Sequence, residues 1–111
     1  MDYVTLGRTG LRVSVMGLGA GGPSRLGQSK GKPEAASVAV VQRALELGVN
    51  FFDTAEAYGT EPIVGKALAG VPRRSVVIST KKGLAREGRL LNAGEMVAGV
   101  EASLSRLGVD Y

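Results

Sequence analysis

Three side chains in the middle of the sequence could carry out acid–base chemistry together. Asp53 directly follows a short, mainly apolar run, Val49–Phe52, and Lys81 directly follows another, Val76–Thr80. Such runs are typical of strands buried on both faces of a parallel sheet, and the carboxyl ends of parallel strands form the edge where α/β proteins place their active sites. Neighbouring strands lie about 4.8 Å apart. The pattern therefore predicts an ion pair between Asp53 and Lys81, with Tyr58 on the loop over the same edge.

These residue types are suited to donating a proton to a carbonyl group. A phenol has an ordinary pKa of about 10 and is a weak acid at neutral pH. A nearby ammonium favours the phenolate form, and a carboxylate can hold that ammonium in place. Tyr58 would then donate a proton to a carbonyl oxygen as a hydride reaches the carbon. The structural alternative is that Asp53 caps a loop, Tyr58 is a surface ring and Lys81 is solvated, and the spacing alone leaves both open.

A glycine-rich segment precedes these residues. Gly17–Gly22 matches the GxGxxG pattern of dinucleotide-binding sites and follows an apolar run. That kind of site needs a helix to begin at the glycines, whereas here a polar loop containing Pro23 runs on to Lys32. The simpler interpretation is a loop whose backbone closely approaches another group. Gly22–Ser29 has nearly the spacing of a phosphate-binding P-loop, but Gln28 stands where the lysine is required.

The absence of two residue types excludes several kinds of site from this chain. Its 111 residues include no histidine and no cysteine. A Ser-His-Asp triad, a thiol nucleophile and a metal site built on histidine or cysteine therefore cannot be formed by these residues alone. We expect no metal.

The charge distribution argues against a nucleic-acid or membrane partner. The net charge of +4 arises from 14 basic and 10 acidic residues, and the basic residues are dispersed, whereas nucleic-acid-binding proteins gather them on one face. A basic nucleic-acid-binding module is therefore the disfavoured alternative. No apolar run reaches the roughly 18 residues that span a bilayer, and the N-terminus lacks a signal-peptide layout. We expect a cytoplasmic protein.

The elements that must position these residues alternate between short strands and amphipathic helices, which predicts an α/β fold with a parallel sheet. Glycine-bounded turns, proline and cap residues set the expected boundaries. The predicted elements are a hairpin over Tyr3–Ser14, a strand over Val15–Leu18, a loop over Gly19–Lys32, a helix from Pro33 to Gly48, a strand over Val49–Phe52, a helix over Glu61–Ala69 capped by Thr60, a strand over Val76–Thr80, a basic loop over Lys81–Leu91, and a helix over Ala93–Leu107 capped by Asn92.

Four sequence blocks resemble, in the same order, those of the aldo-keto reductase family. FFDTAEAYGTE at Phe51–Glu61 resembles the family's Asp–loop–Tyr signature, and VVISTKKG at Val76–Gly83 resembles its catalytic-lysine strand. LGRTGLRVSVMGLGAGG at Leu6–Gly22 is similar to its N-terminal hairpin and first barrel strand. SLSRLGVDY at Ser103–Tyr111 is similar to its approach to the fourth strand. The resemblance therefore spans the whole chain.

This resemblance implies an incomplete (β/α)8 TIM barrel, in which residues 1–111 would be an N-terminal hairpin plus three βα units. It implies NADPH-dependent reduction of aldehydes or ketones, with a small carbonyl compound as the substrate. Tyr58 would be the proton donor, Lys81 would favour its ionised form, and Asp53 would pair with Lys81 and touch the nicotinamide ribose. The residues implied at the nicotinamide end of the cofactor are Gly19, Ala20, Gly21 and Gly22.

The family's pattern also implies groups that these residues do not supply. Its fourth catalytic residue is a histidine at the end of the fourth strand, and most of its cofactor site comes from later strands. We therefore expect this chain to be inactive alone and to self-associate through unpaired barrel edges. Lys82 is expected to point away from the site or into solvent. The alternative is a non-catalytic remnant, or a binding or regulatory member of the same fold.

Overall fold

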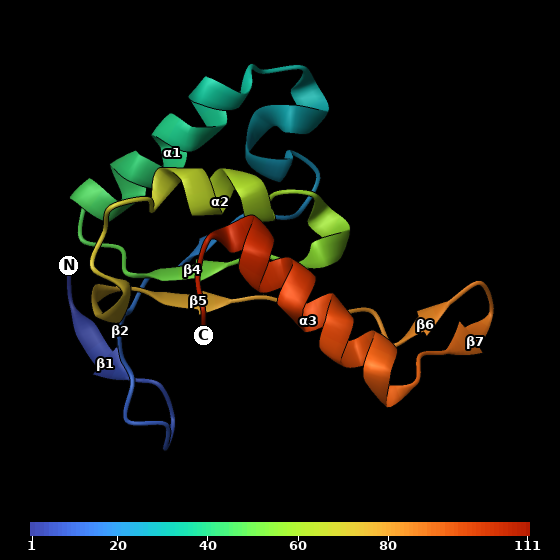
Figure 1. Ribbon diagram of the computed structural model, residues 1–111. Helices are drawn as coiled ribbons and strands as arrows, with labels where there is room; N and C mark the ends of the chain where they lie inside the picture. Colours follow the sequence, from blue (N-terminus) through green and yellow to red (C-terminus); the bar gives the residue numbers. More distant parts are fainter.

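The N-terminal hairpin forms as predicted. The computed structural model describes all of residues 1–111. Strand β1 (Tyr3–Thr5) pairs antiparallel with β2 (Arg12–Ser14). The Tyr3 hydroxyl donates a hydrogen bond to the Gly48 carbonyl at 2.8 Å. This bond fastens the hairpin to the chain just beyond the first helix, beside the parallel sheet (Figure 1).

A three-stranded parallel sheet lies at the centre of the molecule. Its strand order is β3 (Leu18–Gly19), β4 (Phe51–Asp53) and β5 (Val77–Ser79). Phe52 of the central strand lies opposite Leu18 on one side and Ile78 on the other. The parallel pairing confirms the α/β class predicted from the alternation of strands and helices.

The strands differ from their predicted bounds by one to a few residues. Val15 and Met16 are 59% and 64% exposed and belong to no strand, and the Ser14 hydroxyl donates to the Met16 carbonyl, which bends the chain there. Asp53 is the last residue of β4, paired with Ser79, rather than the first residue after the strand. An apolar run does not reveal that a polar residue continues the ladder.

Three helices pack with the sheet to form the core. They are α1 (Glu34–Glu46), α2 (Glu61–Ala67) and α3 (Ala93–Leu107). The short helix α2 lies between the other two (Figure 1). The largest fully buried side chain in the core belongs to Phe52 of the central strand. The core residues are Ala20, Val41, Val49, Phe52, Ile63, Val64, Ala67, Leu68, Val76 and Leu107.

The two predicted N-caps have different outcomes. Asn92 caps α3 as predicted: its side chain accepts from the Glu95 backbone and the Glu95 carboxylate accepts from the Asn92 backbone, both at 2.9 Å, which is a capping box. Thr60 occupies the predicted N-cap position of α2, but its side chain makes no cap bond to the helix, because its hydroxyl is buried and lies 2.9 Å from that of Thr54. Helix α2 also ends at Ala67, two residues early.

Two predicted loops contain short elements. A 3-10 helix, η1 (Arg25–Lys30), interrupts the loop before α1. Within the predicted loop 81–91, β6 (Ala85–Arg86) and β7 (Arg89–Leu90) form a second hairpin. Its two turn residues, Glu87 and Gly88, have φ values of 51° and 79°, the left-handed backbone that a two-residue hairpin turn requires.

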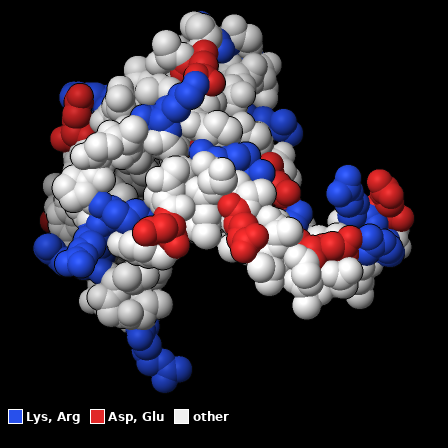
Figure 2. Space-filling view, viewed as in Figure 1, with Lys and Arg blue, Asp and Glu red and all other residues white.

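Acidic and basic side chains are interspersed on the face shown in Figure 2, including on the projecting β6–β7 hairpin. Arg89 in β7 pairs with Glu95 at the start of α3. No helix combines the length and the apolar character needed to cross a membrane.

Candidate active site

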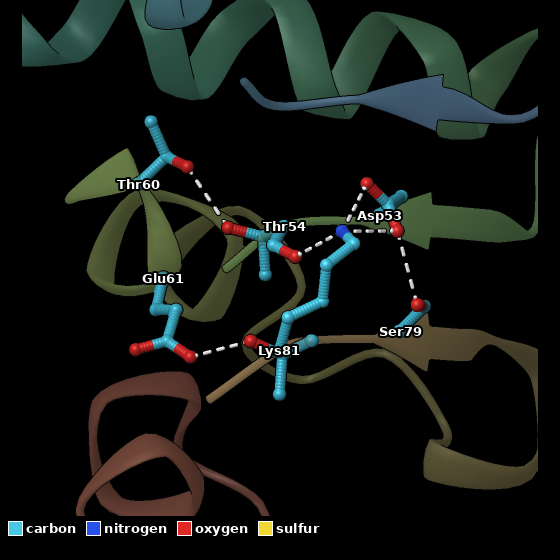
Figure 3. A network of polar contacts seen from close by, with 7 residues as sticks. Asp53, Thr54, Thr60, Glu61, Ser79 and Lys81 are labelled. Atoms are coloured by element: carbon cyan, nitrogen blue, oxygen red, sulfur yellow. Dashed lines mark hydrogen bonds and ion pairs between the residues drawn. The ribbon is translucent and has the colours of Figure 1, made fainter. Parts of the chain in front are cut away.

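The ion pair predicted between Asp53 and Lys81 is present at the carboxyl edge of the sheet. The Lys81 ammonium donates to both carboxylate oxygens of Asp53 at 2.7 Å and to the Thr54 carbonyl at 2.8 Å (Figure 3). On the neighbouring strand, the Ser79 hydroxyl donates to the same carboxylate at 3.0 Å. The carboxylate is therefore fixed by two groups, and the ammonium has three acceptors within hydrogen-bond distance.

This environment keeps Lys81 protonated. The pKa of Lys81 is raised above its ordinary value of 10.5, chiefly because its ammonium is hydrogen-bonded to Asp53. Burial opposes that rise, whereas the charge of Asp53 and the nearby Tyr58 side chain add to it. The group is accordingly a stable positive charge at neutral pH.

Tyr58 lies beside this charge. It ends a 3-10 helix, η2 (Glu56–Tyr58), and the Lys81 nitrogen lies 5.1 Å from the centroid of its ring. The first residue of η2 is tied to the segment that follows β5, because the Glu56 N–H donates to the Lys81 carbonyl at 3.1 Å. Gly59, which ends η2, has a φ of 70° that glycine adopts without strain. The three predicted site residues are thus brought together.

The glycine-rich segment forms one wall of a cleft beside these residues. The cleft has a volume of about 310 Å³ and is lined by Gly19, Gly21, Gly22, Asp53 and Tyr58. No helix begins at these glycines, since α1 starts only at Glu34.

Two members of this segment have roles that the sequence did not reveal. Ala20 is buried in the core, does not line the cleft, and donates its N–H to the Asp53 carbonyl at 2.7 Å. The Tyr58 ring packs directly against the backbone of Gly21, because a Cβ built on Gly21 would lie 2.6 Å from a ring carbon. Only glycine therefore allows the ring to lie where it does.

Lys82 points away from the cleft, which is one of the two expected outcomes, and does not extend into solvent. Its side chain is 20% exposed and forms an ion pair with Glu56 in η2. The stem of Lys82 crosses Gly99 in α3, where a Cβ would overlap its Cδ and Cε atoms. The stem of Lys82 therefore lies over the part of α3 where Gly99 has no side chain. The adjacent residues Lys81 and Lys82 anchor the chain after β5 to Asp53 and to η2, respectively.

Sequence reasoning also missed a set of polar residues around the ion pair. Thr80 donates from its hydroxyl to Glu61 at 2.6 Å, and Glu61 also accepts from Arg106 at 2.6 Å. The sequence signal for these polar contacts was the pair of hydroxyl residues, Ser79 and Thr80, at the end of an apolar strand. Nothing in the local sequence distinguishes Glu61 from an ordinary acidic residue in the first turn of a helix.

A larger cavity lies away from these groups. Its volume is about 550 Å³, and aliphatic side chains and glycines from the ends of α2 and α3 form most of its wall. The smaller cleft is the better candidate site, because convergent polar groups rather than size mark a site for chemistry.

Comparison with known proteins places this geometry in a family. The model of the aldo/keto reductase family matches residues 15–111. The chain is 42% identical to an L-galactose dehydrogenase of Arabidopsis thaliana over 117 residues, which cover all of this chain and 36% of the relative. It is 40% identical over 119 residues to a protein of Oryza sativa subsp. japonica described as a probable voltage-gated potassium channel subunit beta, covering all of this chain and 35% of the relative.

Solved structures give the same result. The structure of a Bombyx mori aldo-keto reductase in complex with NADP matches with a TM-score of 0.74 at 27% identity, over 99% of this chain and 35% of that one. The hairpin and the βα units therefore match the corresponding part of solved aldo-keto reductase structures. The chain belongs to the aldo/keto reductase family, and it spans about a third of the length of the curated relatives named above.

Proposed function

We propose that this protein, in whatever full length its gene encodes, reduces aldehydes or ketones to alcohols with NADPH. That full-length protein is called the natural gene product below. The observation that carries this proposal is the arrangement of Asp53, Lys81 and Tyr58 around a glycine-lined cleft. A relative of the same fold has been solved with NADP, which supports the choice of cofactor.

The cleft is compatible with one end of such a cofactor. A Cβ on Gly19 or Gly22 would meet no atom within 4 Å, so these glycines leave open space where a flat ring could lie against the backbone. The volume of about 310 Å³ is at the lower end of the range for small-molecule pockets, which suits one ring system of a dinucleotide. Asp53 is partly exposed there and could accept a hydrogen bond from a ribose hydroxyl. Bound NADPH would supply the hydride that adds to the carbonyl carbon.

The residues of this chain would supply the proton. As the carbonyl carbon gains a hydride, its oxygen becomes an alkoxide, and the Tyr58 hydroxyl gives up its proton to that oxygen. The positive charge of Lys81 stabilises the phenolate left behind, and water returns the proton after the alcohol leaves. Asp53 holds the ammonium in place and prevents it from turning towards the alkoxide.

The test is the oxidation of NADPH by the natural gene product in the presence of a panel of aldehydes and ketones, followed by absorbance. Tyr58→Phe removes the proton donor and keeps the ring. We expect kcat to fall by at least about 100-fold, which is the usual contribution of a positioned general acid, with NADPH affinity nearly unchanged.

Tyr111→Phe is the matched control. Tyr111 does not line the cleft, and its backbone carbonyl rather than its hydroxyl accepts from Arg73. We expect wild-type kcat from this control. Turnover retained in Tyr58→Phe would refute the role of proton donor, and no NADPH oxidation by the wild-type protein with any carbonyl compound would refute the reductase proposal.

A binding role is the second candidate, because a relative at 40% identity is described as a channel subunit. On this hypothesis the natural gene product would bind NADPH and, with NADPH bound, would bind another protein. NADPH binding measured by fluorescence, without turnover of any carbonyl compound, would favour it over the reductase.

A further inference from the structure

Lys81 is held at both of its ends. Its ammonium is bound by Asp53 and by the Thr54 carbonyl. Its backbone is held by two hydrogen bonds: the Lys81 carbonyl accepts from the Glu56 N–H at 3.1 Å, and the Thr80 hydroxyl of the preceding residue donates to Glu61 at 2.6 Å. A long side chain anchored only at its charged end could still rock about its backbone, and the bond from Thr80 restricts that movement on the side of α2.

The acceptor of the bond from Thr80 is itself fixed. Glu61 is the first residue of α2 and is 1% exposed. Its other oxygen accepts from the Arg106 guanidinium at 2.6 Å, and Arg106 also donates to Ser103 at 3.1 Å. Arg106 and Ser103 belong to α3. A single buried carboxylate therefore joins the end of β5 to two helices.

Glu61 remains ionised in this position. Burial by itself would raise the pKa of Glu61, but hydrogen bonds from Thr80, Arg106 and Ser103 outweigh it and lower the pKa below the ordinary value of 4.5. A carboxylate accepts hydrogen bonds at both oxygens, so Thr80 keeps its acceptor throughout the neutral pH range.

The start of α2 also reaches the charged end of Lys81. Thr60 precedes Glu61, and its hydroxyl lies 2.9 Å from that of Thr54. The carbonyl of Thr54 is one of the acceptors of the Lys81 ammonium. Figure 3 shows Thr60 facing Thr54, with Glu61 next to Thr60 in the chain. Two adjacent residues, Thr60 just before α2 and Glu61 at its start, thus support the two ends of the same lysine.

We infer that Glu61 is a positioning residue for Lys81, acting through the Thr80 hydroxyl and braced by Arg106 of α3. This inference rests on the proposed function for its catalytic consequence, but the position of Lys81 is independent of it. The competing account is that Glu61 only fastens β5 and α2 to α3. On that account the contact from Thr80 would stabilise the fold without affecting the ammonium.

The experiment compares Thr80→Val with Thr80→Ser in the natural gene product. Valine has nearly the shape of threonine without the hydroxyl, and serine keeps the hydroxyl. Thr80 is exposed, so neither change removes buried packing, and the ion pair between Glu61 and Arg106 is left intact.

The first readout needs neither cofactor nor substrate. The pKa of Lys81 is measured by carbon NMR of protein labelled with carbon-13 at lysine Cε, which leaves the ammonium unmodified, with the resonance assigned by its loss in Lys81→Met. Asp53 and Tyr58 are the titratable groups that raise this pKa. In Thr80→Val the ammonium should spend less time on Asp53, so the pKa of Lys81 should fall towards its ordinary value, and in Thr80→Ser it should stay at the wild-type value.

The second readout is turnover. We expect kcat to fall about tenfold in Thr80→Val and to be restored in Thr80→Ser, because displacements of about 1 Å at a reacting centre cost up to about 100-fold. A Thr80→Val protein that loses thermal stability but keeps the wild-type pKa of Lys81 overturns the inference. Wild-type protein without turnover refutes the proposed function instead, while the titration of Lys81 still decides whether Glu61 positions it.

Discussion

The contact between Gly21 and Tyr58 leads to a prediction in which a single methyl group should impair catalysis while sparing the fold. A Cβ on Gly21 would lie 2.6, 2.8 and 2.9 Å from three carbons of the Tyr58 ring. Contacts between non-bonded carbons are ordinarily about 3.5–4.0 Å. The ring in Gly21→Ala must therefore move by about 1 Å.

The size of the two effects follows from where the ring can go. Tyr58 is only half-buried and borders the open cleft, so it can turn away from the new methyl group. The cost in the free energy of unfolding should then be at the low end of the range for overpacking, about 1 kcal/mol. The same movement takes the hydroxyl from its place beside Lys81, and a displacement of about 1 Å corresponds to a loss of up to about 100-fold in kcat.

The assay is steady-state reduction of a carbonyl substrate by the natural gene product, with urea unfolding measured alongside. Gly83→Ala is the matched control, because its new Cβ would meet only the Ala85 carbonyl oxygen at 4.0 Å and its backbone is not left-handed. We expect wild-type kcat from Gly83→Ala. Wild-type kcat from Gly21→Ala, or a loss of kcat explained by unfolding, would refute the reasoning.

Two further predictions concern stability, measured by urea unfolding of the natural gene product. Gly65→Ala should lower the free energy of unfolding: alanine ordinarily favours a helix by about 1 kcal/mol, but the new Cβ would lie 2.7 Å from the Leu107 carbonyl oxygen, and overpacking costs about 1–3 kcal/mol. Gly94→Ala, whose Cβ meets nothing closer than 3.4 Å, should not lower it, and equal effects of the two would contradict the packing argument. The second prediction concerns Glu61, whose lowered pKa gives the folded state stability that is full above about pH 4.5 and is lost as the pH falls through the folded pKa. Glu61→Gln should therefore be less stable than wild type at about pH 7, and the difference should shrink at about pH 3. A difference that stays constant would show that this carboxylate is not ionised in the fold.

Local sequence patterns predicted most of the framework. The amphipathic periodicity and the boundary residues gave α1 and α3 nearly as they are observed, with Asn92 capping the latter. The short apolar runs gave the parallel strands to within one to a few residues. The predictions failed for the partners of single polar side chains, as at Thr60, which precedes α2 as predicted but whose hydroxyl pairs with a buried neighbour instead of the helix. They also missed the β6–β7 hairpin, whose strands are only two residues long.

The central pair of the candidate site was predictable for a topological reason. Asp53 and Lys81 are 28 residues apart, but each lies where a parallel strand ends, and adjacent parallel strands must bring those ends together. Strand adjacency alone therefore determined that the two charges would meet.

Only the tertiary structure decided how the rest of the site is supported. Lys82 faces away from the cleft as expected, but its partners were not predicted: Gly99 leaves room for its stem and Glu56 pairs with its charge. Glu61 meets Arg106 across 45 residues. These contacts depend on the distance and rotation of helices relative to the sheet, which the packing of the whole core sets. A residue's local sequence fixes its chemistry and its element, but the side chain it faces is determined by how those elements pack.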